Sequence, residues 1–431
     1  MPVNSIHADT LPEWLAGIEQ LHPKNIEMGL ERVHVVKERL GIRFDCPVIT
    51  VGGTNGKGST CAMMQAIWQK AGHRVGLYSS PHIHDFEERV RIDGQTVPEK
   101  TIVHTFKKVE AARGDIPLTF FEFTTLTIMQ ILAEASLDVV ILEVGLGGRL
   151  DAVNLIDSQV AVVTNVDIDH VDFLGHTREL IGYEKAGIFR QEKMAVYGDY
   201  DPPHSLVAYA DEIGADLRVL GRDYHSICQG DHWSYIGEAL QFDNLDPPKL
   251  HGKNQVKNAT NALMVLEAMQ DILPFDEKAV RAGLSQVCLP GRFQVLQKEP
   301  LVVLDAAHNP HAAVVLADNL RSMGEFHATY AVFGAMSDKD IEGVIAPMKD
   351  SVDFWYLTGL PLSRAATTEM LKEKLIAAGV RPDRILLFET AADALDAAKI
   401  NARKNDRIIA FGSFWIVTGV TRTVHSDSST S

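Results

Sequence analysis

The chain has little cysteine for its length, and what it has is scattered. Only four cysteines occur among 431 residues, and no two of them form a C-x-x-C pair. This spacing gives no zinc signature and is typical of proteins in a reducing compartment, so we predict a cytoplasmic location. The sequence also lacks an H-E-x-x-H zinc pattern and a G-x-S-x-G nucleophile signature. The cysteines are Cys46, Cys61, Cys228 and Cys288.

The chain is also poor in basic charge and in long apolar runs. It has 41 basic and 57 acidic residues and a net charge of −16, which argues against a nucleic-acid partner. Anionic substrates must therefore be met by local positive sites. The longest apolar region, residues 120–135, is interrupted by polar side chains and is too short to span a bilayer. We expect a buried helix there, and neither a signal peptide nor a membrane partner.

The most informative segment that is present runs from Val48 to Thr60. An apolar run ends in a glycine-rich turn, which is followed by Lys57, two hydroxyl residues and a helical pattern that ends at Gly72. This order suits a nucleotide triphosphate. Backbone N–H groups of the turn and the helix N-terminus face the phosphates, and the lysine reaches the outer ones. A plain glycine-rich turn with a surface lysine is the alternative, and the matching register of strand, turn and helix disfavours it.

The loop differs from the common P-loop. Val51 stands where G-x-x-x-x-G-K-[ST] has its first glycine, and Gly58 stands where the hydroxyl residue should follow the lysine. The first hydroxyl comes one place later, at Ser59. The hydroxyl ligand of a magnesium ion is therefore expected from another part of the chain.

Short apolar runs alternate with helical patterns in two series, separated by an irregular stretch between about residues 229 and 250. Such alternation predicts parallel sheets covered on both faces. We therefore predict an α/β protein in which a P-loop-containing parallel-sheet domain, residues 1–290, precedes a smaller Rossmann-like α/β domain, residues 291–424. The polar residues 425–431 are expected to form a disordered tail.

Polar residues at strand ends are candidate ligands, because ligands of open parallel sheets bind beyond the carboxyl ends of the strands. Glu143 ends one apolar run and is placed to hold magnesium, although an acid in a turn looks the same. Ser80 ends another run and could supply the missing hydroxyl, although Ser-Pro is also a common turn. His170 is an unusual magnesium ligand by itself. Lys185 and Asp305 are weak candidates when each is taken alone.

Together these segments resemble the Mur ligase superfamily and, within it, the folylpolyglutamate synthase/dihydrofolate synthase branch. The resemblance extends from about His22 to Val417, with eight matching blocks in one order. The blocks are His22-Pro-Lys with Gly29-Leu-Glu-Arg-Val33, Gly53-Thr-Asn-Gly-Lys-Gly-Ser59, Ser79-Ser-Pro-His82, Glu143-Val-Gly-Leu-Gly-Gly-Arg-Leu-Asp-Ala152, Asp169-His170, Glu184-Lys-Ala-Gly-Ile188, Leu289-Pro-Gly-Arg292 and Asp305-Ala-Ala-His-Asn-Pro310.

The resemblance implies an ADP-forming amide ligase. ATP phosphorylates a substrate carboxylate, the amine of L-glutamate attacks the acyl phosphate, and phosphate leaves. The acceptors implied are 7,8-dihydropteroate and folates, with ATP as co-substrate, magnesium at two sites as cofactor and a monomer as the working form. The alternatives are a monofunctional folylpolyglutamate synthase, a UDP-muramyl amino-acid ligase, which Gly58 and the Ser-Pro-His block disfavour, and an ATPase switch.

Residue by residue, the resemblance assigns nucleotide, metal and catalytic roles. The ATP contacts implied are Thr54, Asn55, Gly56, Lys57, Gly58, Ser59, Asn258, Arg292 and Asp305. Ser80 and Glu143 are implied to bind one magnesium ion and His170 a second. Lys185 matches a lysine that becomes a carbamate in this family, and Lys57, His170 and Lys185 are the implied catalytic residues. Since carbamate formation needs a neutral amine, the pKa of Lys185 should be low, or metal must trap the carbamate.

The same resemblance implies a pocket for the pteroate or folate acceptor. An aromatic side chain of the pocket, Phe120 or Phe121, could pack on the pterin ring. Ordinary core packing is the alternative for these aromatics, and the block near His22–Val33 favours the bifunctional type. The pocket residues implied are Ile26, Glu27, Met28, Thr119, Phe120, Phe121, Glu122, Leu150, Asp151 and Ala152.

Overall fold

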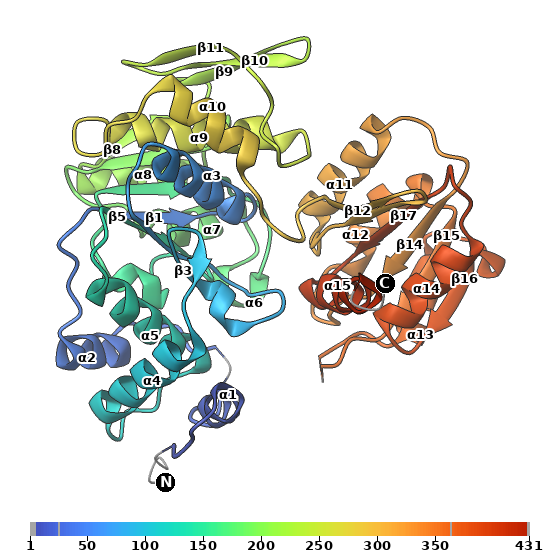
Figure 1. The fold of residues 1–431 in the computed structure, drawn as a ribbon, viewed down its shortest axis with the longest axis horizontal. Coiled ribbons are helices and arrows are strands. Elements are labelled where there is room, and N and C mark those ends of the chain that lie inside the picture. The colour runs from blue at the N-terminus through green and yellow to red at the C-terminus, as the bar shows by residue number, and fades with distance from the viewer. Residues whose placement is uncertain (1–5, 25, 363, 429–431) are drawn as a thin grey trace. The chain divides into compact units, whose positions relative to one another are not determined.

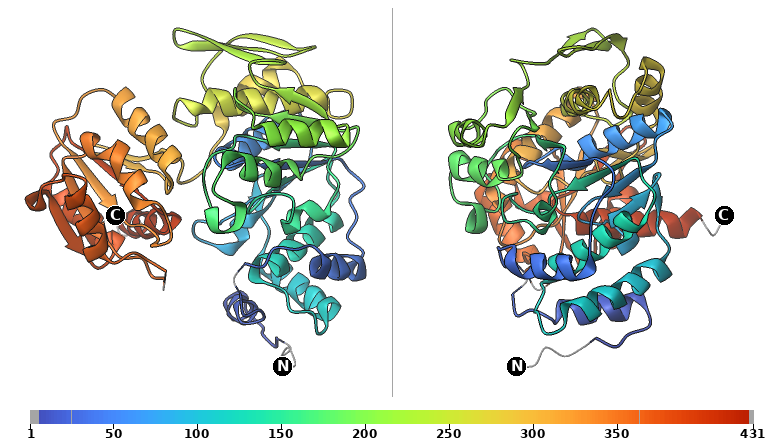
Figure 2. Two further views of the ribbon diagram at one scale, coloured as in Figure 1. Left: turned by 180° about the vertical axis from the view of Figure 1, so that it is seen from behind. Right: turned by 90° about the vertical axis from the view of Figure 1, so that its left-hand side faces the viewer.

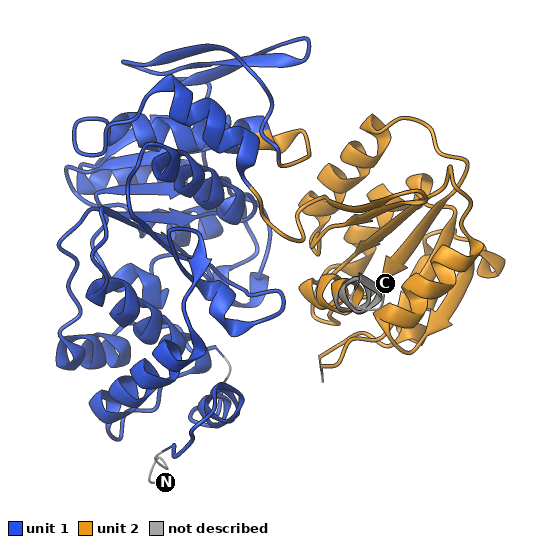
Figure 3. Cartoon of the chain, in the orientation of Figure 1, with its two compact units in different colours: residues 1–249, 256–287 blue, residues 250–255, 288–431 orange. Residues whose placement is uncertain are grey.

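The computed structural model describes residues 6–24, 26–362 and 364–428. The chain divides into two compact units (Figure 3). The first comprises residues 1–249 and 256–287, and the second comprises residues 250–255 and 288–431. Each unit is an α/β structure with its own sheet, which confirms the fold class predicted from the sequence.

The first unit is built on an eight-stranded sheet with the order β4-β3-β2-β5-β1-β6-β7-β8 (Figure 1). Strands β2 and β5 to β8 run parallel to β1, whereas β3 is antiparallel to both β2 and β4. The carboxyl ends of β1, β2, β5 and β6 therefore meet along one edge. The strands are β1 Val48–Gly52, β2 Val75–Tyr78, β3 Val90–Ile92, β4 Gln95–Thr96, β5 Val139–Glu143, β6 Val160–Val163, β7 Met194–Tyr197 and β8 Asp216–Val219.

Helices cover both faces of this sheet (Figure 2). Helix α3 packs on β1, β2 and β5 with α10 outside it, and α5 packs on β2 and β3 with α4 outside it. The helices are α1 Leu11–Glu19, α2 Glu31–Leu40, α3 Lys57–Lys70, α4 Glu99–Arg113, α5 Phe120–Glu134, α6 Val171–Leu174, α7 Arg178–Ala186, α8 His204–Ile213, α9 Asn254–Ala268 and α10 Glu277–Gln286, with 3₁₀ turns at Phe86–Arg89 and Ala152–Leu155.

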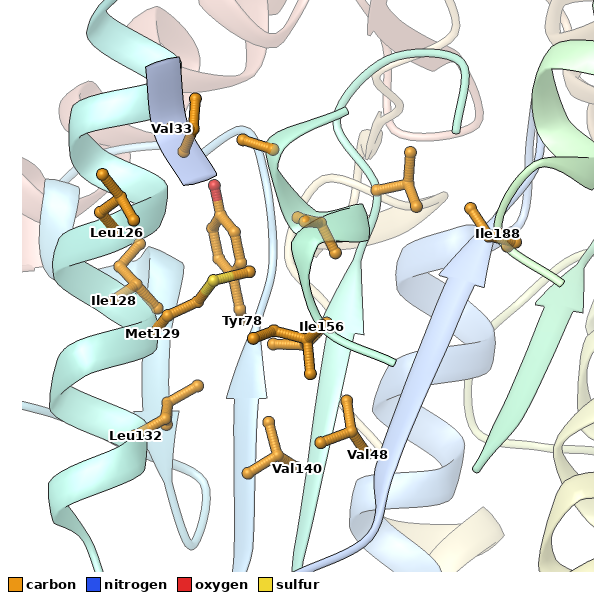
Figure 4. Packing of buried hydrophobic residues seen from close by; sticks show 14 of the residues in the cluster. Val33, Val48, Tyr78, Leu126, Ile128, Met129, Leu132, Val140, Ile156 and Ile188 are labelled. Carbon is orange, nitrogen blue, oxygen red and sulfur yellow. The ribbon is translucent and has the colours of Figure 1, made fainter. Parts of the chain in front are cut away.

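The main core of this unit lies between the sheet and α5. Strand β1 is buried throughout, as a central strand covered on both faces must be. Figure 4 shows Tyr78 of β2 and Val140 of β5 facing Met129 and Leu132 of α5. The Tyr78 hydroxyl forms a hydrogen bond of 2.8 Å with that of Thr125, so even the polar atom of this ring is paired. The interrupted apolar region is thus the buried helix that we predicted.

The stretch expected to be irregular instead forms a three-stranded antiparallel sheet with the order β11-β10-β9. Trp233 and Tyr235 alternate with more exposed residues along β10 and are buried. The Tyr235 hydroxyl donates to Glu267 of α9 over 2.7 Å, which ties the small sheet to the helix beneath it. The strands are β9 His225–Gln229, β10 His232–Ile236 and β11 Gln241–Leu245.

The second unit contains a six-stranded sheet with the order β12-β13-β17-β14-β15-β16, parallel except for β12. Phe333, Trp355 and Phe411 lie at the centre of its core. The strands are β12 Gln294–Lys298, β13 Leu301–Leu304, β14 Thr329–Phe333, β15 Phe354–Thr358, β16 Ile385–Phe388 and β17 Arg407–Phe411. The helices are α11 Pro310–Ser322, α12 Ile341–Met348, α13 Thr368–Ala377, α14 Ala391–Asn401 and α15 Phe414–Ser428, with 3₁₀ turns at Lys349–Ser351 and Pro382–Arg384.

The predicted tail begins inside a helix. Residues 425–428 are the last turn of α15, because the helical pattern that starts at Phe414 continues through them, and residues 429–431 lie outside the described residues. Within the described ranges, none of the helices combines the length and the apolar character needed to cross a bilayer.

Candidate active site

The predicted phosphate loop connects β1 to α3. Gly56 precedes the first helical residue with a φ of 87°, a conformation that favours glycine, and the helix then starts at Lys57. The Lys57 ammonium donates to the carbonyl oxygen of Gly53 over 2.9 Å, so the side chain folds back over the loop. Ser59 lies buried in the first helical turn. The structure thus gives residues 53–59 the geometry of a phosphate-binding loop.

The end of the neighbouring strand β6 fixes the shape of this loop. The Asn55 N–H donates to the side-chain oxygen of Asn165 over 2.8 Å, and the Thr54 N–H donates to the Asn165 carbonyl over 3.0 Å. The Thr164 hydroxyl donates to the Asn55 carbonyl over 2.6 Å. We did not predict roles for Thr164 and Asn165, although their place at a strand end was a usable signal.

Asn258 reaches the same loop from α9. A Cβ atom on Gly56 would lie 2.6 Å from the side-chain oxygen of Asn258, so the two residues touch. Of the predicted nucleotide residues of the first unit, the structure therefore brings together residues 54–59 and Asn258.

Two of the three predicted metal ligands meet at the carboxyl ends of β2 and β5. The Ser80 N–H donates to the Glu143 carboxylate over 3.2 Å, and Glu143 is only 4% exposed. A hydroxyl and a carboxylate are suitable ligands for magnesium. His170 lies in the wall of the same cavity as Ser80, and its ring pairs with Asp169 over 3.1 Å. Among the described residues, no three His, Cys, Asp or Glu side chains converge as a metal site.

Lys185, near the end of α7, is 4% exposed. Burial lowers the pKa of its ammonium to about 7, and the positive charge of Lys57 acts in the same direction. The carboxylates of Asp169 and Asp151 act in the opposite direction. A large fraction of Lys185 is therefore a neutral amine near pH 7, which is the form that can react with carbon dioxide.

A cavity of about 260 Å³ opens beside Ser80. Its wall contains every predicted acceptor residue except Phe120. That ring instead packs against Phe86, with a centroid distance of 6.4 Å, and beneath the Arg89 guanidinium. Phe121 is the aromatic side chain that faces the cavity. The lining residues are Ile26, Glu27, Met28, Gly29, Ser80, Pro81, Arg89, Thr119, Phe121, Glu122, Gly145, Leu146, Leu150, Asp151, Ala152 and His170.

Arg32 of α2 links two acidic residues of this wall. It donates to Glu27 over 3.0 Å and to Glu122 over 2.8 Å. The second oxygen of Glu122 accepts the Thr119 N–H over 2.7 Å and caps α5, while Glu27 also pairs with His22 over 3.0 Å. Arg32 thus holds the segment around Glu27 against the start of α5. The sequence analysis did not predict this role, because one of the two partners, Glu122, lies 90 positions away in the chain.

Asp151 is a buried residue of the cavity wall, and its carboxylate accepts hydrogen bonds from backbone N–H groups. It accepts the N–H groups of Leu146 over 2.8 Å and of Val153 over 2.9 Å. Burial raises the pKa of this carboxyl to about 6, against the lowering effect of those N–H groups and of Lys57. The geometry makes Asp151 the residue that shapes the glycine-rich turn after β5.

The second unit contains the remaining predicted nucleotide residues, Arg292 and Asp305. The Asp305 carboxylate accepts the N–H groups of Phe293 and Ala307, each over 2.8 Å. Burial raises its pKa, although the nearby Arg292 charge lowers it. The Arg292 guanidinium lies 5.0 Å from the centroid of the Phe414 ring. Asp305 follows the carboxyl end of β13, and Arg292 precedes β12, whose first residue Gln294 pairs with Leu304 at that end of β13.

Comparison with known families identifies the class to which this site belongs. The Mur ligase middle domain matches residues 51–266, and the Mur ligase glutamate ligase domain matches residues 291–414. The chain is thus a Mur ligase in both of its units, as the motifs had indicated.

Comparison with individual relatives identifies the family within the Mur ligases to which the chain belongs. The chain is 43% identical to the dihydrofolate synthase/folylpolyglutamate synthase of Escherichia coli K12, over 96% of this chain and 95% of that protein. It resembles the structure of E. coli FolC in complex with DHPP and ADP, with a TM-score of 0.92, 42% identity and coverage of 98% of this chain and 99% of that one. A bifunctional folylpolyglutamate synthase/dihydrofolate synthase with Mn, AMPPNP and L-glutamate bound matches with a TM-score of 0.89 and 43% identity, covering 97% and 98%. The chain belongs to the dihydrofolate synthase/folylpolyglutamate synthase family.

Proposed function

We infer that the protein joins L-glutamate to 7,8-dihydropteroate, forming dihydrofolate, and extends folates with further glutamates at the expense of ATP. One observation supports this most directly. The cavity that matches the acceptor pocket shares Ser80 with the Ser80–Glu143 pair at the sheet edge that carries the phosphate loop. A carboxylate bound there lies where a terminal phosphoryl group can be delivered to it.

The reaction proceeds in two steps. The acceptor carboxylate attacks the terminal phosphorus of ATP, so that a carbon–oxygen–phosphorus link forms and ADP leaves. The glutamate amine then attacks the acyl carbon, loses its proton and expels inorganic phosphate, which leaves an amide. The protein acts mainly by positioning the reactants and stabilising charge.

Each residue of the site has a proposed part in this scheme. Loop residues 53–59 and Asn258 hold the phosphates and the nucleotide, and Lys57 stabilises the charge of the transferring group. Ser80 and Glu143 fit one magnesium ion and His170 a second, and these ions would neutralise phosphate charge. We propose further nucleotide contacts from Arg292 and Asp305 in the second unit.

Lys185 is proposed to act as a carbamate. Its neutral amine adds to carbon dioxide, a carbon–nitrogen bond forms and a proton leaves, so that a cation becomes an anion with two oxygens. Burial and the low pKa of the amine support this step. We also propose that the protein works as a monomer and that it is cytoplasmic. Its four free thiols fit a reducing compartment.

Release of ADP by purified protein tests the function. The assay contains ATP, magnesium and L-glutamate, with dihydropteroate, tetrahydrofolate or no acceptor. We expect release with each pterin, and a product that is heavier by one glutamate residue. Release with tetrahydrofolate alone would indicate a monofunctional folylpolyglutamate synthase. Release without an acceptor would contradict the ligase and favour an ATPase switch.

A further inference from the structure

The acidic groups of the acceptor cavity are already engaged within the protein. Both oxygens of Glu122 accept hydrogen bonds, from Arg32 and from the Thr119 N–H. Both oxygens of Glu27 pair with basic side chains, and Asp151 accepts two backbone N–H groups. The wall therefore contains carboxylates whose charge is compensated by the protein itself.

Arg89, in contrast to these acids, is a basic residue of the cavity wall. It is only 8% exposed. Its Nε donates to Nδ1 of His82 over 2.8 Å, and its guanidinium lies 5.6 Å from the ring centroids of both Phe86 and Phe120. The Tyr78 hydroxyl is a further polar neighbour. Across residues 6–24, 26–362 and 364–428, no acidic side chain forms an ion pair with Arg89.

The neighbours of Arg89 do not compensate its charge. The Nδ1 atom of His82 accepts the Arg89 Nε–H and therefore carries no proton, so that this ring is a neutral acceptor. Burial lowers the pKa of Arg89, yet a guanidinium stays protonated in proteins. Since an uncompensated buried charge is costly, a cation held in a cavity wall is a strong binding group for an anion.

We propose that Arg89 binds a carboxylate of the acceptor substrate. The inference rests on the proposed function, which supplies acceptors of this chemistry. The Nε atom is taken by His82, which leaves the terminal nitrogens to form the paired hydrogen bonds that a guanidinium makes with a carboxylate. Two carboxylates have this chemistry. One is the reacting benzoate-type carboxylate of dihydropteroate, and the other is the α-carboxylate on the terminal glutamate of a folate.

Equilibrium binding tests the proposal without any need for turnover. Dihydropteroate and its neutral carboxamide are titrated into the protein by pterin fluorescence, without ATP or metal, so that only protein groups contact the carboxylate. We expect the wild-type protein to bind dihydropteroate about 10- to 100-fold more tightly than the carboxamide, as a charge-assisted pair gives. The same titration is made with tetrahydrofolate and its α-carboxamide. Equal affinities of the wild-type protein within both pairs of ligands would overturn the proposal, and this result needs no variant.

Variants assign the effect to Arg89. Arg89→Gln should remove the preference for the carboxylate, and Arg89→Lys should keep part of it. Arg32→Gln is the matched control, because that guanidinium is already paired with two acids, and it should weaken both ligand forms by the same factor. If Arg89→Gln weakens the carboxylate and the carboxamide equally, both for dihydropteroate and for tetrahydrofolate, Arg89 is a structural residue and the proposal is wrong.

Tetrahydrofolate and its α-carboxamide separate the two sources of the carboxylate. If Arg89→Gln removes the preference for dihydropteroate over its carboxamide, the reacting carboxylate is the partner. If it removes only the preference for tetrahydrofolate over its α-carboxamide, the α-carboxylate is the partner. A wild-type protein that binds no pterin would contradict the proposed function itself, whereas indifference to the carboxylate contradicts this inference alone.

Discussion

Replacing Lys185 by methionine should make the protein more stable and abolish its ligase activity. The side chain is buried, and the folded protein lowers its pKa from an ordinary 10.5 to about 7. Folding must therefore either remove a proton from this amine or bury its charge, and both cost free energy. Methionine has a similar length and no charge, so it fills the same space without that cost.

The gain in stability of Lys185→Met and its pH dependence follow from these two pKa values of the lysine. Below about pH 7 the folded and unfolded chains both carry the proton, and the cost of burying it is greatest, about 5 kcal/mol as an upper limit. Between the two pKa values the unfolded chain binds more protons than the folded protein, so wild-type stability rises with pH. The advantage of the variant should therefore fall to about 2 kcal/mol near pH 9.

Denaturant unfolding from pH 6 to pH 9 in carbon-dioxide-free buffer measures this difference. Asp151 titrates in both proteins, so its contribution largely cancels. An advantage of the variant that does not change with pH would refute the reasoning, because it would mean that Lys185 has the same pKa in the folded and unfolded states.

Bicarbonate should restore the turnover of the wild-type protein in carbon-dioxide-depleted buffer, and more strongly above pH 7 than below it. It should not restore the turnover of Lys185→Met.

Other variants test separate parts of the site. Lys57→Ala should lower turnover by about 100- to 1,000-fold through lost charge stabilisation, with near-normal acceptor affinity, and unchanged turnover would exclude its role. Gly56→Ala should abolish binding of an ATP analogue, since a Cβ there lies 2.6 Å from Asn258 and the φ of 87° is unfavourable for alanine; calorimetry checks this. Phe121→Leu should raise the KM for dihydropteroate about 10-fold, whereas Phe120→Leu, outside the cavity wall, should have a smaller effect; equal effects would contradict the assignment.

Much of the fold was predictable, because its signals are local. The phosphate loop shows a strand, a turn and a helix within about a dozen residues, and Gly72 ends α3 with a φ of 93°, as the glycine at that place predicts. The cavity lined by the predicted acceptor residues was predictable only through resemblance, since segments around Glu27, Thr119 and Leu150 converge from distant parts of the chain. No periodicity within any of the three segments indicates that they meet.

Two features escaped the sequence analysis for physical reasons. The sheet β9–β11 has short strands between polar turns, and its alternation of buried Trp233 and Tyr235 covers too few residues to stand out. The role of Arg32 depends on two ion pairs, one of which spans 90 positions in the chain. An arginine at a helix start is usually solvated, so only the folded structure distinguishes this one.

The chain passes from one unit to the other three times, because residues 250–255 belong with the second unit while their flanks belong with the first. Within residues 250–255, the Lys253 N–H donates to the side-chain oxygen of the buried Asn319 over 3.0 Å, and Gly252 lies against the same asparagine. A fragment cut at residues 287/288 would leave Asn319 without these contacts. When the second unit is exchanged between relatives, in the laboratory or in evolution, residues 250–255 of the donor must therefore be transferred together with residues 288–431.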